Sequence, residues 1–135
     1  MIRLAINGYG RIGRSVLRAL KSRGARLAIL SNGTPHMLES AVRSAAIDAF
    51  LDDIFSVEAV GRFKTDTSVY ELVTTSWRLY PSAVSFQSSN RWDIAGATRF
   101  GFRSIWINRS AQPDEYRDLP PSAILRSLEG LPATA

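Results

Sequence analysis

The chain has 135 residues, enough for one domain and too few for two, since domains usually span about 100–200 residues. Hydrophobic residues make up 45% and charged residues 21%, a composition that argues against intrinsic disorder and fibrous repeats. The formal net charge is +5, and the absence of cysteine excludes a disulfide framework, a thiolate metal site and a cysteine nucleophile. No apolar run is long enough to cross a bilayer, and the N-terminus lacks the apolar core of a signal peptide. We therefore expect a soluble, cytoplasmic protein without membrane contacts.

The basic residues are unevenly distributed. Residues 1–38 carry seven basic side chains and no carboxylate, whereas residues 39–135 carry ten basic and twelve acidic side chains. A basic block can indicate nucleic-acid binding. Here, however, the charges are spread along one predicted strand and one predicted helix without interleaved aromatic residues. We expect a solvated helix face and no nucleic-acid partner.

The first part of the chain predicts strand, helix, strand and helix. The first strand covers residues 3–7 after Ile2, and a helix follows from Ile12 to a stop at Gly24. A second apolar run at 27–30 predicts the second strand. The next helix has Thr34 as its N-cap and Pro35 at its first position, and apolar residues at helical spacing continue it to Ala46.

The alternation continues in the second part. The pattern predicts strands at 54–57, 83–86 and 102–108, and a helix at 69–77 that ends before Pro81. Another helix is capped by Asn90, with Asp93 in capping-box position, and ends at Gly101. Four prolines then predict a loosely structured tail: Pro113, Pro120, Pro121 and Pro132.

Five strands that alternate with four helices predict an α/β fold. We expect a three-layer Rossmann-like sandwich in one domain, 1–135, with a five-stranded parallel sheet in the order 3-2-1-4-5 and residues 2–6 as the central strand. Ligands of such sheets bind beyond the carboxyl ends of the strands, where the strand order reverses. The segments to examine are residues 7–13, 31–33, the loop around Lys64, and 88–93.

Gly8-Tyr9-Gly10-Arg11-Ile12-Gly13 is a Gly-x-Gly-x-x-Gly motif placed after a strand and before a helix. The glycines permit a tight turn, close approach of a pyrophosphate and close helix packing, with backbone N–H groups directed at the anion. The acidic residue that usually binds the adenosine ribose about 20 residues later is replaced by Ser31 and Asn32. Dinucleotide binding and a purely structural turn both remain open.

Residues 2–20 closely resemble the N-terminus of glyceraldehyde-3-phosphate and erythrose-4-phosphate dehydrogenases, because Ile-Asn-Gly-Tyr-Gly-Arg-Ile-Gly-Arg is that family's version of the motif. The resemblance implies that residues of this turn line the phosphate and ribose positions of NAD. These residues are Asn7, Gly8, Gly10, Arg11, Ile12 and, from the motif itself, Gly13. Nothing later resembles the catalytic Ser-Cys-Thr-Thr-Asn segment of those enzymes, and a chain without cysteine cannot supply their nucleophile.

A second group of polar residues lies at predicted strand ends. Ser31 ends one strand, Lys64 lies in a loop, and the segment 88–93 supplies hydroxyl, amide and carboxylate groups. Together they could surround one small anion. Each has an ordinary alternative: Ser31 as a turn former, Lys64 as a solvated loop charge and Asp93 as a capping-box residue.

The segments Leu-Ala-Ile-Leu-Ser-Asn-Gly, Ser-Ser-Asn-Arg-Trp-Asp-Ile-Ala-Gly-Ala and Phe-Gly-Phe-Arg-Ser-Ile-Trp-Ile-Asn-Arg resemble type II 2-haloacid dehalogenases of the haloacid dehalogenase superfamily, over residues 17 to about 132. The resemblance implies that Ser31 and Asn32 contact the substrate carboxylate or reacting oxygen, and that Lys64 balances the charge of the nucleophile. It implies that the nucleophile and the hydrolytic water are positioned by Tyr70, Ser88, Asn90 and Asp93. No metal or required cofactor is expected.

The start of the chain departs from that family. Its members open with a strand that ends Asp-x-Tyr-Gly-Thr, whose Asp is the nucleophile, and then insert a helical cap. Here the strand ends Asn7-Gly8-Tyr9-Gly10-Arg11, and a single helix leads to Ser31. Asn7 stands where the nucleophile is expected, a neutral amide cannot replace a carboxylate nucleophile, and the cap is absent.

We interpret the chain as a chimera, natural or engineered, of a dehydrogenase-like segment up to about residue 20 and a cap-less dehalogenase-like core over 21–135. The expected function is a catalytically inactive scaffold with a vestigial site. A weak NAD-binding or phosphate-binding module and a residual hydrolase remain as alternatives. A small anion or phosphate-bearing molecule is the expected ligand, and a homo-oligomer or domain swap is a further expectation.

Overall fold

The computed structural model describes residues 3–6 and 11–134, with the backbone alone at 3–6, 11 and 12. The strands in this part of the chain are β1 (Arg3–Ile6), β2 (Arg26–Ser31), β3 (Asp53–Ser56), β4 (Ser85–Ser88), β5 (Arg103–Ile107) and β6 (Ala123–Leu125). The α-helices are α1 (Arg11–Ser22), α2 (Pro35–Ser44), α3 (Thr67–Trp77), α4 (Arg91–Phe100) and α5 (Leu131–Thr134). None of the described helices is long and apolar enough to cross a membrane.

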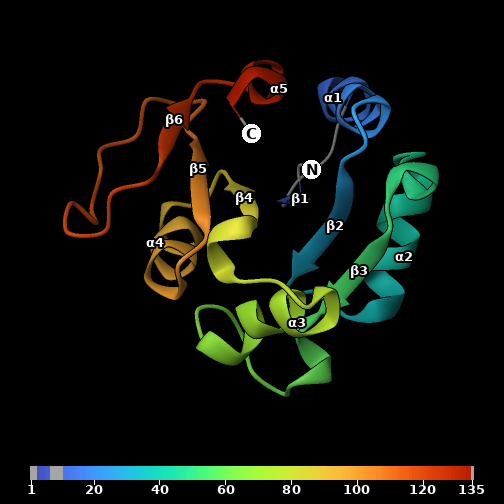
Figure 1. Cartoon of the computed structure of the whole chain (residues 1–135), viewed down its shortest axis with the longest axis horizontal. Helices are drawn as coiled ribbons and strands as arrows, with labels where there is room; N and C mark the ends of the chain where they lie inside the picture. Colours follow the sequence, from blue (N-terminus) through green and yellow to red (C-terminus); the bar gives the residue numbers. More distant parts are fainter. Residues whose placement is uncertain (1–2, 7–10, 135) are drawn as a thin grey trace.

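The strands form a single sheet in the order β3-β2-β1-β4-β5-β6, and every neighbouring pair is parallel (Figure 1). Helices α1 and α2 pack on one face, together with the C-terminal α5, and helices α3 and α4 pack on the other. The chain thus has the expected α/β fold. Its strand order reverses between β1 and β4, so the carboxyl ends of these two strands form the switch point.

Two details of the predicted architecture are wrong. The sheet has six strands and not five, because residues 123–125 add β6 beside β5. The predicted loose tail instead ends in a 3-10 turn and α5, whose Leu128 and Leu131 are buried against α1. The prolines restrict the backbone locally, but burial of these leucines determines where the tail lies.

The core consists of two apolar clusters, one on each face of the sheet. Buried residues of β2 alternate between them, with Leu27 and Ile29 facing α1 and with Ala28 and Leu30 facing α3 and α4. This alternation is the two-residue period of a strand. A strand covered on both faces must be apolar throughout, which explains the continuous apolar run that predicted β2.

The predicted helix ends are mostly confirmed. Thr34 caps α2 by accepting a hydrogen bond from the Met37 amide at 3.2 Å. Gly101 ends α4 with a φ of +109°, in the left-handed region that favours glycine. The fourth strand begins later than predicted, at Ser85, because residues 81–83 form a 3-10 turn after the start imposed by Pro81.

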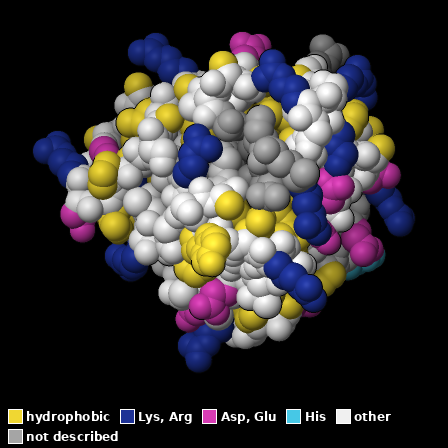
Figure 2. All heavy atoms as spheres, in the orientation of Figure 1, with side chains coloured by type: hydrophobic (Ala, Val, Ile, Leu, Met, Phe, Trp, Pro, Cys, Tyr) yellow, Lys and Arg dark blue, Asp and Glu magenta, His cyan; other side chains and the backbone are white. Residues whose placement is uncertain are grey.

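The basic residues form no single patch on the face shown in Figure 2, where the Lys and Arg side chains are spread over the surface. Several basic residues in or just after α1 contact distant segments. Arg23, which follows α1, donates to the Pro132 carbonyl at 2.6 Å, Arg18 lies over the Phe50 ring, and Lys21 pairs with Asp52. These side chains thus connect α1 and the residues after it to the segment before β3 and to the C-terminal part of the chain.

Asp52 is expected to make the fold sensitive to acid. Partial burial opposes its ionisation, but hydrogen bonds from Lys21 and from the Leu27 amide lower the pKa of Asp52 below 3.8. A carboxylate with a lowered pKa stabilises the folded state above its unfolded pKa, and this contribution is lost as the pH falls through the folded pKa. Asp52→Asn should therefore reduce stability at pH 7 by about 1 kcal/mol. In urea titrations, the difference from wild type should begin to shrink near pH 3.8 and should disappear as the pH falls through the lower, folded pKa; a difference that does not shrink with falling pH would contradict this role.

Candidate active site at the carboxyl ends of the strands

The candidate site lies at the carboxyl edge of the sheet, around the switch point between β1 and β4. Ser31 is the last residue of β2 and Ser88 the last residue of β4, the two strands that flank β1. Among the predicted cofactor residues, Asn7, Gly8 and Gly10 lie outside the described residues, as do the side chains of Arg11 and Ile12. Gly13 lies in the first turns of α1.

Three of the predicted residues form one hydrogen-bonded network. The Lys64 ammonium donates to Asp93 Oδ2 at 2.8 Å, and the Tyr70 hydroxyl donates to Asp93 Oδ1 at 2.9 Å. Lys64 comes from the loop before α3, Tyr70 from α3 and Asp93 from the first turn of α4. Both carboxylate oxygens of Asp93 are therefore held by donors from separate parts of the chain.

The network is buried. The side chain of Lys64 is 1% exposed and that of Asp93 is 0% exposed. Burial lowers the pKa of Lys64, and the negative charge of Asp93 opposes this decrease. Burial, and then Asp93, raises the pKa of Tyr70, so that its hydroxyl stays protonated and remains a donor. The result is a paired ammonium and carboxylate in a low-dielectric environment, where a further charge would interact strongly.

Asn32 connects this network to the end of β2. Its side-chain oxygen accepts a hydrogen bond from the Lys64 backbone amide at 2.9 Å, which fixes the loop that carries the ammonium. Ser31 accepts from the Gly33 amide at 3.1 Å, so the interpretation of Ser31 as a turn former is confirmed. Ser56 at the end of β3 donates to the Gly33 carbonyl at 2.7 Å and holds the same turn.

Ser88 and Asn90 form the turn between β4 and α4. The Ser88 hydroxyl accepts from the Asn90 amide at 3.1 Å. No hydrogen bond joins Ser31, Ser88 or Asn90 to the Lys64–Asp93 pair within residues 3–6 and 11–134. The structure thus brings Asn32, Lys64, Tyr70 and Asp93 into direct contact, and it leaves the other three predicted residues at the surrounding strand ends.

Two ordinary interpretations of these residues are wrong. Lys64 is not a solvated loop charge, since its ammonium is buried over the Phe86 ring, 5.2 Å from the centroid. Asp93 does not act as a capping-box residue, because the Asn90 side chain makes no cap hydrogen bond and the Asp93 carboxylate binds Lys64 and Tyr70. The local sequence resembles a cap, but tertiary partners compete for the carboxylate.

Arg91 and Gly96 support the site and were not predicted. Arg91 is 8% exposed, pairs with Asp114 at 2.7 Å and donates to the Tyr116 and Leu119 carbonyls, each at 2.7 Å. It therefore ties the start of α4 to the loop after β5. A Cβ at Gly96 would lie 2.5 Å from the Tyr70 hydroxyl and 2.8 Å from Thr65, so only glycine lets α4 approach this network. Neither role has a local sequence signal, because both depend on distant partners.

Large apolar side chains of the described residues are exposed at the carboxyl edge, with Met37 at 61%, Phe63 at 70% and Trp92 at 39%. A cavity of about 250 Å³ lies beside Asn32 and Phe63, and one of about 230 Å³ lies beside Asn90 and Trp92. Within the described part of the chain, His, Asp and Glu side chains form no cluster of three or more that could hold a metal ion.

Comparison with known proteins identifies relatives of this arrangement. A family model described as haloacid dehalogenase-like hydrolase matches residues 9–101. An (S)-2-haloacid dehalogenase of Pseudomonas sp. strain CBS-3 is 43% identical over 116 residues, which is 86% of this chain and 51% of that protein. A second, from Pseudomonas sp. strain YL, is 42% identical over 115 residues, 85% of this chain and 50% of that protein. The chain thus spans about half the length of these relatives.

Solved structures give the same result. The crystal structure of an L-2-haloacid dehalogenase is 40% identical, with a TM-score of 0.89 over 92% of this chain and 55% of the other. L-2-haloacid dehalogenase from Xanthobacter autotrophicus with chloropropionic acid covalently bound is 28% identical, with a TM-score of 0.80 over 91% of this chain and 59% of the other. The chain belongs to the haloacid dehalogenase-like hydrolase family.

Proposed function

We propose that the chain is the core of a 2-haloacid dehalogenase that keeps the residues surrounding the reacting groups and lacks the nucleophile, so that it is inactive as written. The observation that carries this proposal is the buried Lys64–Asp93 pair beside the switch point, held by Tyr70 and Asn32. The position that follows β1 in the sequence, where the family has its nucleophilic aspartate, is Asn7.

The proposed chemistry of the family site is displacement at carbon. A carboxylate at position 7 would attack C2 of a 2-haloacid, form an ester and release the halide, and water would then hydrolyse the ester. A relative with chloropropionic acid covalently bound supports an ester stage. In this scheme the Lys64 ammonium balances the carboxylate charge, and Ser31 and Asn32 contact the substrate carboxylate. Asp93 holds the Lys64 ammonium and Tyr70 holds Asp93, while Ser88 and Asn90 position the nucleophile and water.

Two features make the chain inactive in this proposal. The amide of Asn7 cannot serve as the carboxylate nucleophile. Helix α1 is the only helix between β1 and β2 in the described part of the chain, and large apolar side chains are exposed at the carboxyl edge. Both observations support the absence of a cap that would exclude water and position the substrate. Substrate positioning can lower a reaction barrier by about 7–11 kcal/mol, so loss of the cap alone should reduce turnover by several orders of magnitude.

We expect no halide release from L-2-chloropropionate by the chain as written and at most a trace after Asn7→Asp. The substitution supplies the missing carboxylate at the position that follows β1 in the sequence, but it leaves the substrate without a cap to position it. Ion chromatography of released chloride measures both rates. Turnover by the intact Asn7 form would contradict the proposal.

Two controls keep this result interpretable. Asn7-Gly8 is prone to deamidation, which would create the aspartate spontaneously, so the mass of freshly purified protein must be checked before the assay. Asn32→Asp is the matched control because it also adds a carboxylate in an Asn-Gly pair, at the end of β2, and its side-chain oxygen can still accept from the Lys64 amide. Chloride release by Asn32→Asp would show that any added carboxylate suffices and would remove the special role of position 7.

The glycine motif supports a second candidate function, binding of NAD or another phosphate-bearing ligand. Its residues 8–13 fall between the end of β1 and the first turns of α1, the context in which such motifs bind a pyrophosphate. The dehydrogenase-like sequence of residues 2–20 is also the basis for proposing that the chain is a chimera.

Any NAD binding should be weak, with a dissociation constant of about 0.1–1 mM. Asn32 stands where a carboxylate would accept hydrogen bonds from the ribose hydroxyls, and each lost charge-assisted hydrogen bond reduces binding by about 1.5–3 kcal/mol. Titration calorimetry with NAD measures this affinity. A low-micromolar dissociation constant would make NAD binding, and not the inactive dehalogenase site, the main function.

A further inference from the structure

Strand β3 forms an open edge of the sheet and leaves backbone groups directed away from β2. β3 is the last strand on its side of the sheet and pairs only with β2 within residues 3–6 and 11–134. The Asp52 amide donates to the Leu27 carbonyl on β2 at 2.8 Å. Because alternate residues of a strand direct their backbone groups to opposite edges, the N–H groups of Asp53 and Phe55 are directed to the open side. An edge of this kind is a template for an additional strand.

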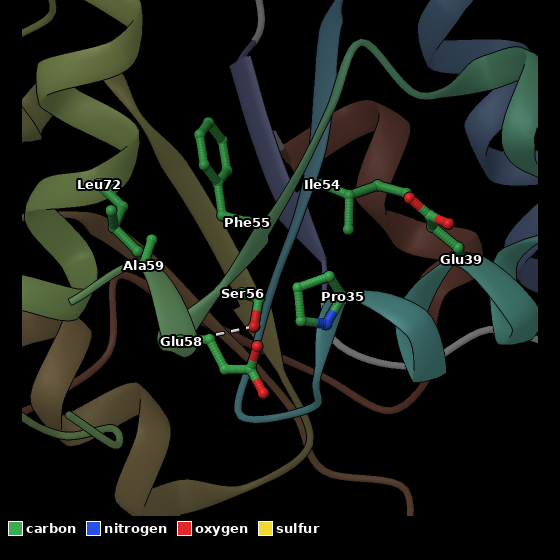
Figure 3. Close-up of a pocket in the computed structure, with 8 residues that line it drawn as sticks. All are labelled: Pro35, Glu39, Ile54, Phe55, Ser56, Glu58, Ala59 and Leu72. Carbon is green, nitrogen blue, oxygen red and sulfur yellow. Dashed lines mark hydrogen bonds between the residues drawn. The ribbon is translucent and has the colours of Figure 1, made fainter. Parts of the chain in front are cut away.

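Two cavities border this edge and together form what we name the β3 groove. The first, of about 430 Å³, lies where β3 meets the start of α2 and includes Pro35, Glu39 and Ile54 (Figure 3). The second, of about 460 Å³, lies between β3 and α3 and includes Glu71. Phe55 and Leu72 line both cavities, so the two are adjacent. Ile54 and Phe55 point to opposite sides of β3 and supply half-buried apolar surface on each side (Figure 3).

The charge of the groove is opposite to that of the whole chain. Its lining includes Glu39, Glu58 and Glu71 and no lysine or arginine, although the chain has a net charge of +5. All three glutamates are exposed, and none forms an ion pair within the described residues. Pairing of β3 with β3 of a second copy would bring these same carboxylates together, and like charges across an interface oppose association.

We propose that the β3 groove binds an extended, basic peptide segment of a partner protein. The segment adds to the sheet as a further strand and receives its main-chain hydrogen bonds from the β3 edge. Its alternating side chains enter the two apolar cavities, and its lysines or arginines meet the three glutamates. Main-chain pairing of this type gives affinity, and pockets for alternate side chains give specificity. This site is separate from the Lys64–Asp93 network and does not depend on catalysis.

Fluorescence anisotropy with labelled heptapeptides tests the proposal. A heptapeptide with three central valines and two lysines at each end presents both valine and lysine on each face of an extended strand; it should bind the wild-type chain saturably, and the same peptide with glutamates in place of the lysines should not. N-methylation of two alternate amides along one edge of the basic peptide should weaken binding about tenfold through the loss of two hydrogen bonds. Equal affinity of the N-methylated peptide would show that charge alone holds it and would overturn strand addition.

Charge reversal identifies the site. Glu39→Lys combined with Glu71→Lys should lower the affinity for the basic peptide about tenfold, because each surface ion pair changes affinity up to about fivefold. The same double variant should gain binding of the acidic peptide. Asp118→Lys is the matched control, since Asp118 is exposed and lies outside the groove lining, and it should leave both affinities unchanged. Binding of the acidic peptide shows that the double variant is folded. Unchanged affinities in the double variant, or the same shift in Asp118→Lys, would overturn the assignment.

Discussion

Lys64→Met is expected to reduce the free energy of unfolding by about 3–5 kcal/mol, because among the described residues it leaves the buried Asp93 carboxylate with Tyr70 as its remaining side-chain donor. The methionine fills a similar volume against Phe86, so the loss reflects the unpaired charge and not a cavity. Urea unfolding at neutral pH, followed by far-UV circular dichroism, measures the change. A loss below 1 kcal/mol would show that the carboxylate is reached by water.

Replacement of both Lys64 and Asp93 measures how much the interaction between the two charges contributes to stability. Asp93→Leu alone should also destabilise, whereas Lys64→Met together with Asp93→Leu should recover most of the stability, since apolar residues often replace a buried ion pair without loss. The residual loss is assigned to the Tyr70 hydroxyl, which then lacks its carboxylate partner. Additive losses in the double variant would mean that the two charges do not interact.

The Lys64–Asp93 pair should also make the free energy of unfolding depend on pH. Burial lowers the pKa of Lys64 below 10.5 in the folded chain. Between the folded and unfolded values the folded state binds fewer protons than the unfolded state, so this group makes stability rise with pH through that window. Lys64→Met should remove this rise of the free energy of unfolding with pH. The other titrating groups are present in both proteins, so the comparison isolates Lys64. Identical slopes in the two proteins would contradict the lowered pKa.

Gly96→Ala is the second substitution with a large expected effect. The new Cβ would lie 2.5 Å from the hydroxyl of Tyr70, a fully buried side chain in an apolar cluster, and 2.8 Å from Thr65. Overpacking of this kind typically destabilises by about 1–3 kcal/mol, and displacement of Tyr70 also disturbs its hydrogen bond to Asp93. Thermal unfolding measures the stability, and near-UV circular dichroism reports the displaced aromatic side chain.

Gly13→Ala is the matched control, because Gly13 also lies within a helix. Among the described residues, a Cβ there would have its nearest contact at 4.0 Å, with Leu128. Alanine should therefore stabilise α1 by about 0.5–1 kcal/mol through its higher helix propensity. If Gly96→Ala and Gly13→Ala had equal effects, the close approach of α4 to Tyr70 would not be important for stability.

The sequence predicted the elements whose signals are local. The apolar run at 27–30, the Thr34 cap and the glycine after α4 depend on residues within one turn or strand, and each is found in the structure. β6 was missed because three residues between prolines have no periodicity of their own. It forms where residues 123–125 pair with β5, a long-range contact.

The candidate site also combines features that the sequence predicts with features that depend on distant contacts. The topology rule placed Ser31 and residues 88–93 at one edge, because parallel strands end on the same side of a sheet. Burial of the Lys64–Asp93 pair could not be read from the loop sequence, since it depends on α3 and α4 packing around it. Arg91 was missed for a similar reason, because its partners lie 23 to 28 residues away.

Intact-mass spectrometry after incubation with L-2-chloropropionate tests the central claim most directly, that the network around Lys64 is complete except for a nucleophile at position 7. Freshly purified Asn7 protein, the Asn7→Asp variant and the Asn32→Asp control are compared, and peptide mapping locates any adduct. We expect any ester adduct to be a small fraction of the protein, confined to residue 7 of the Asn7→Asp variant, and we expect none on the other two proteins. An adduct on the intact Asn7 protein, or an equal adduct on the Asn32→Asp control, would contradict the claim.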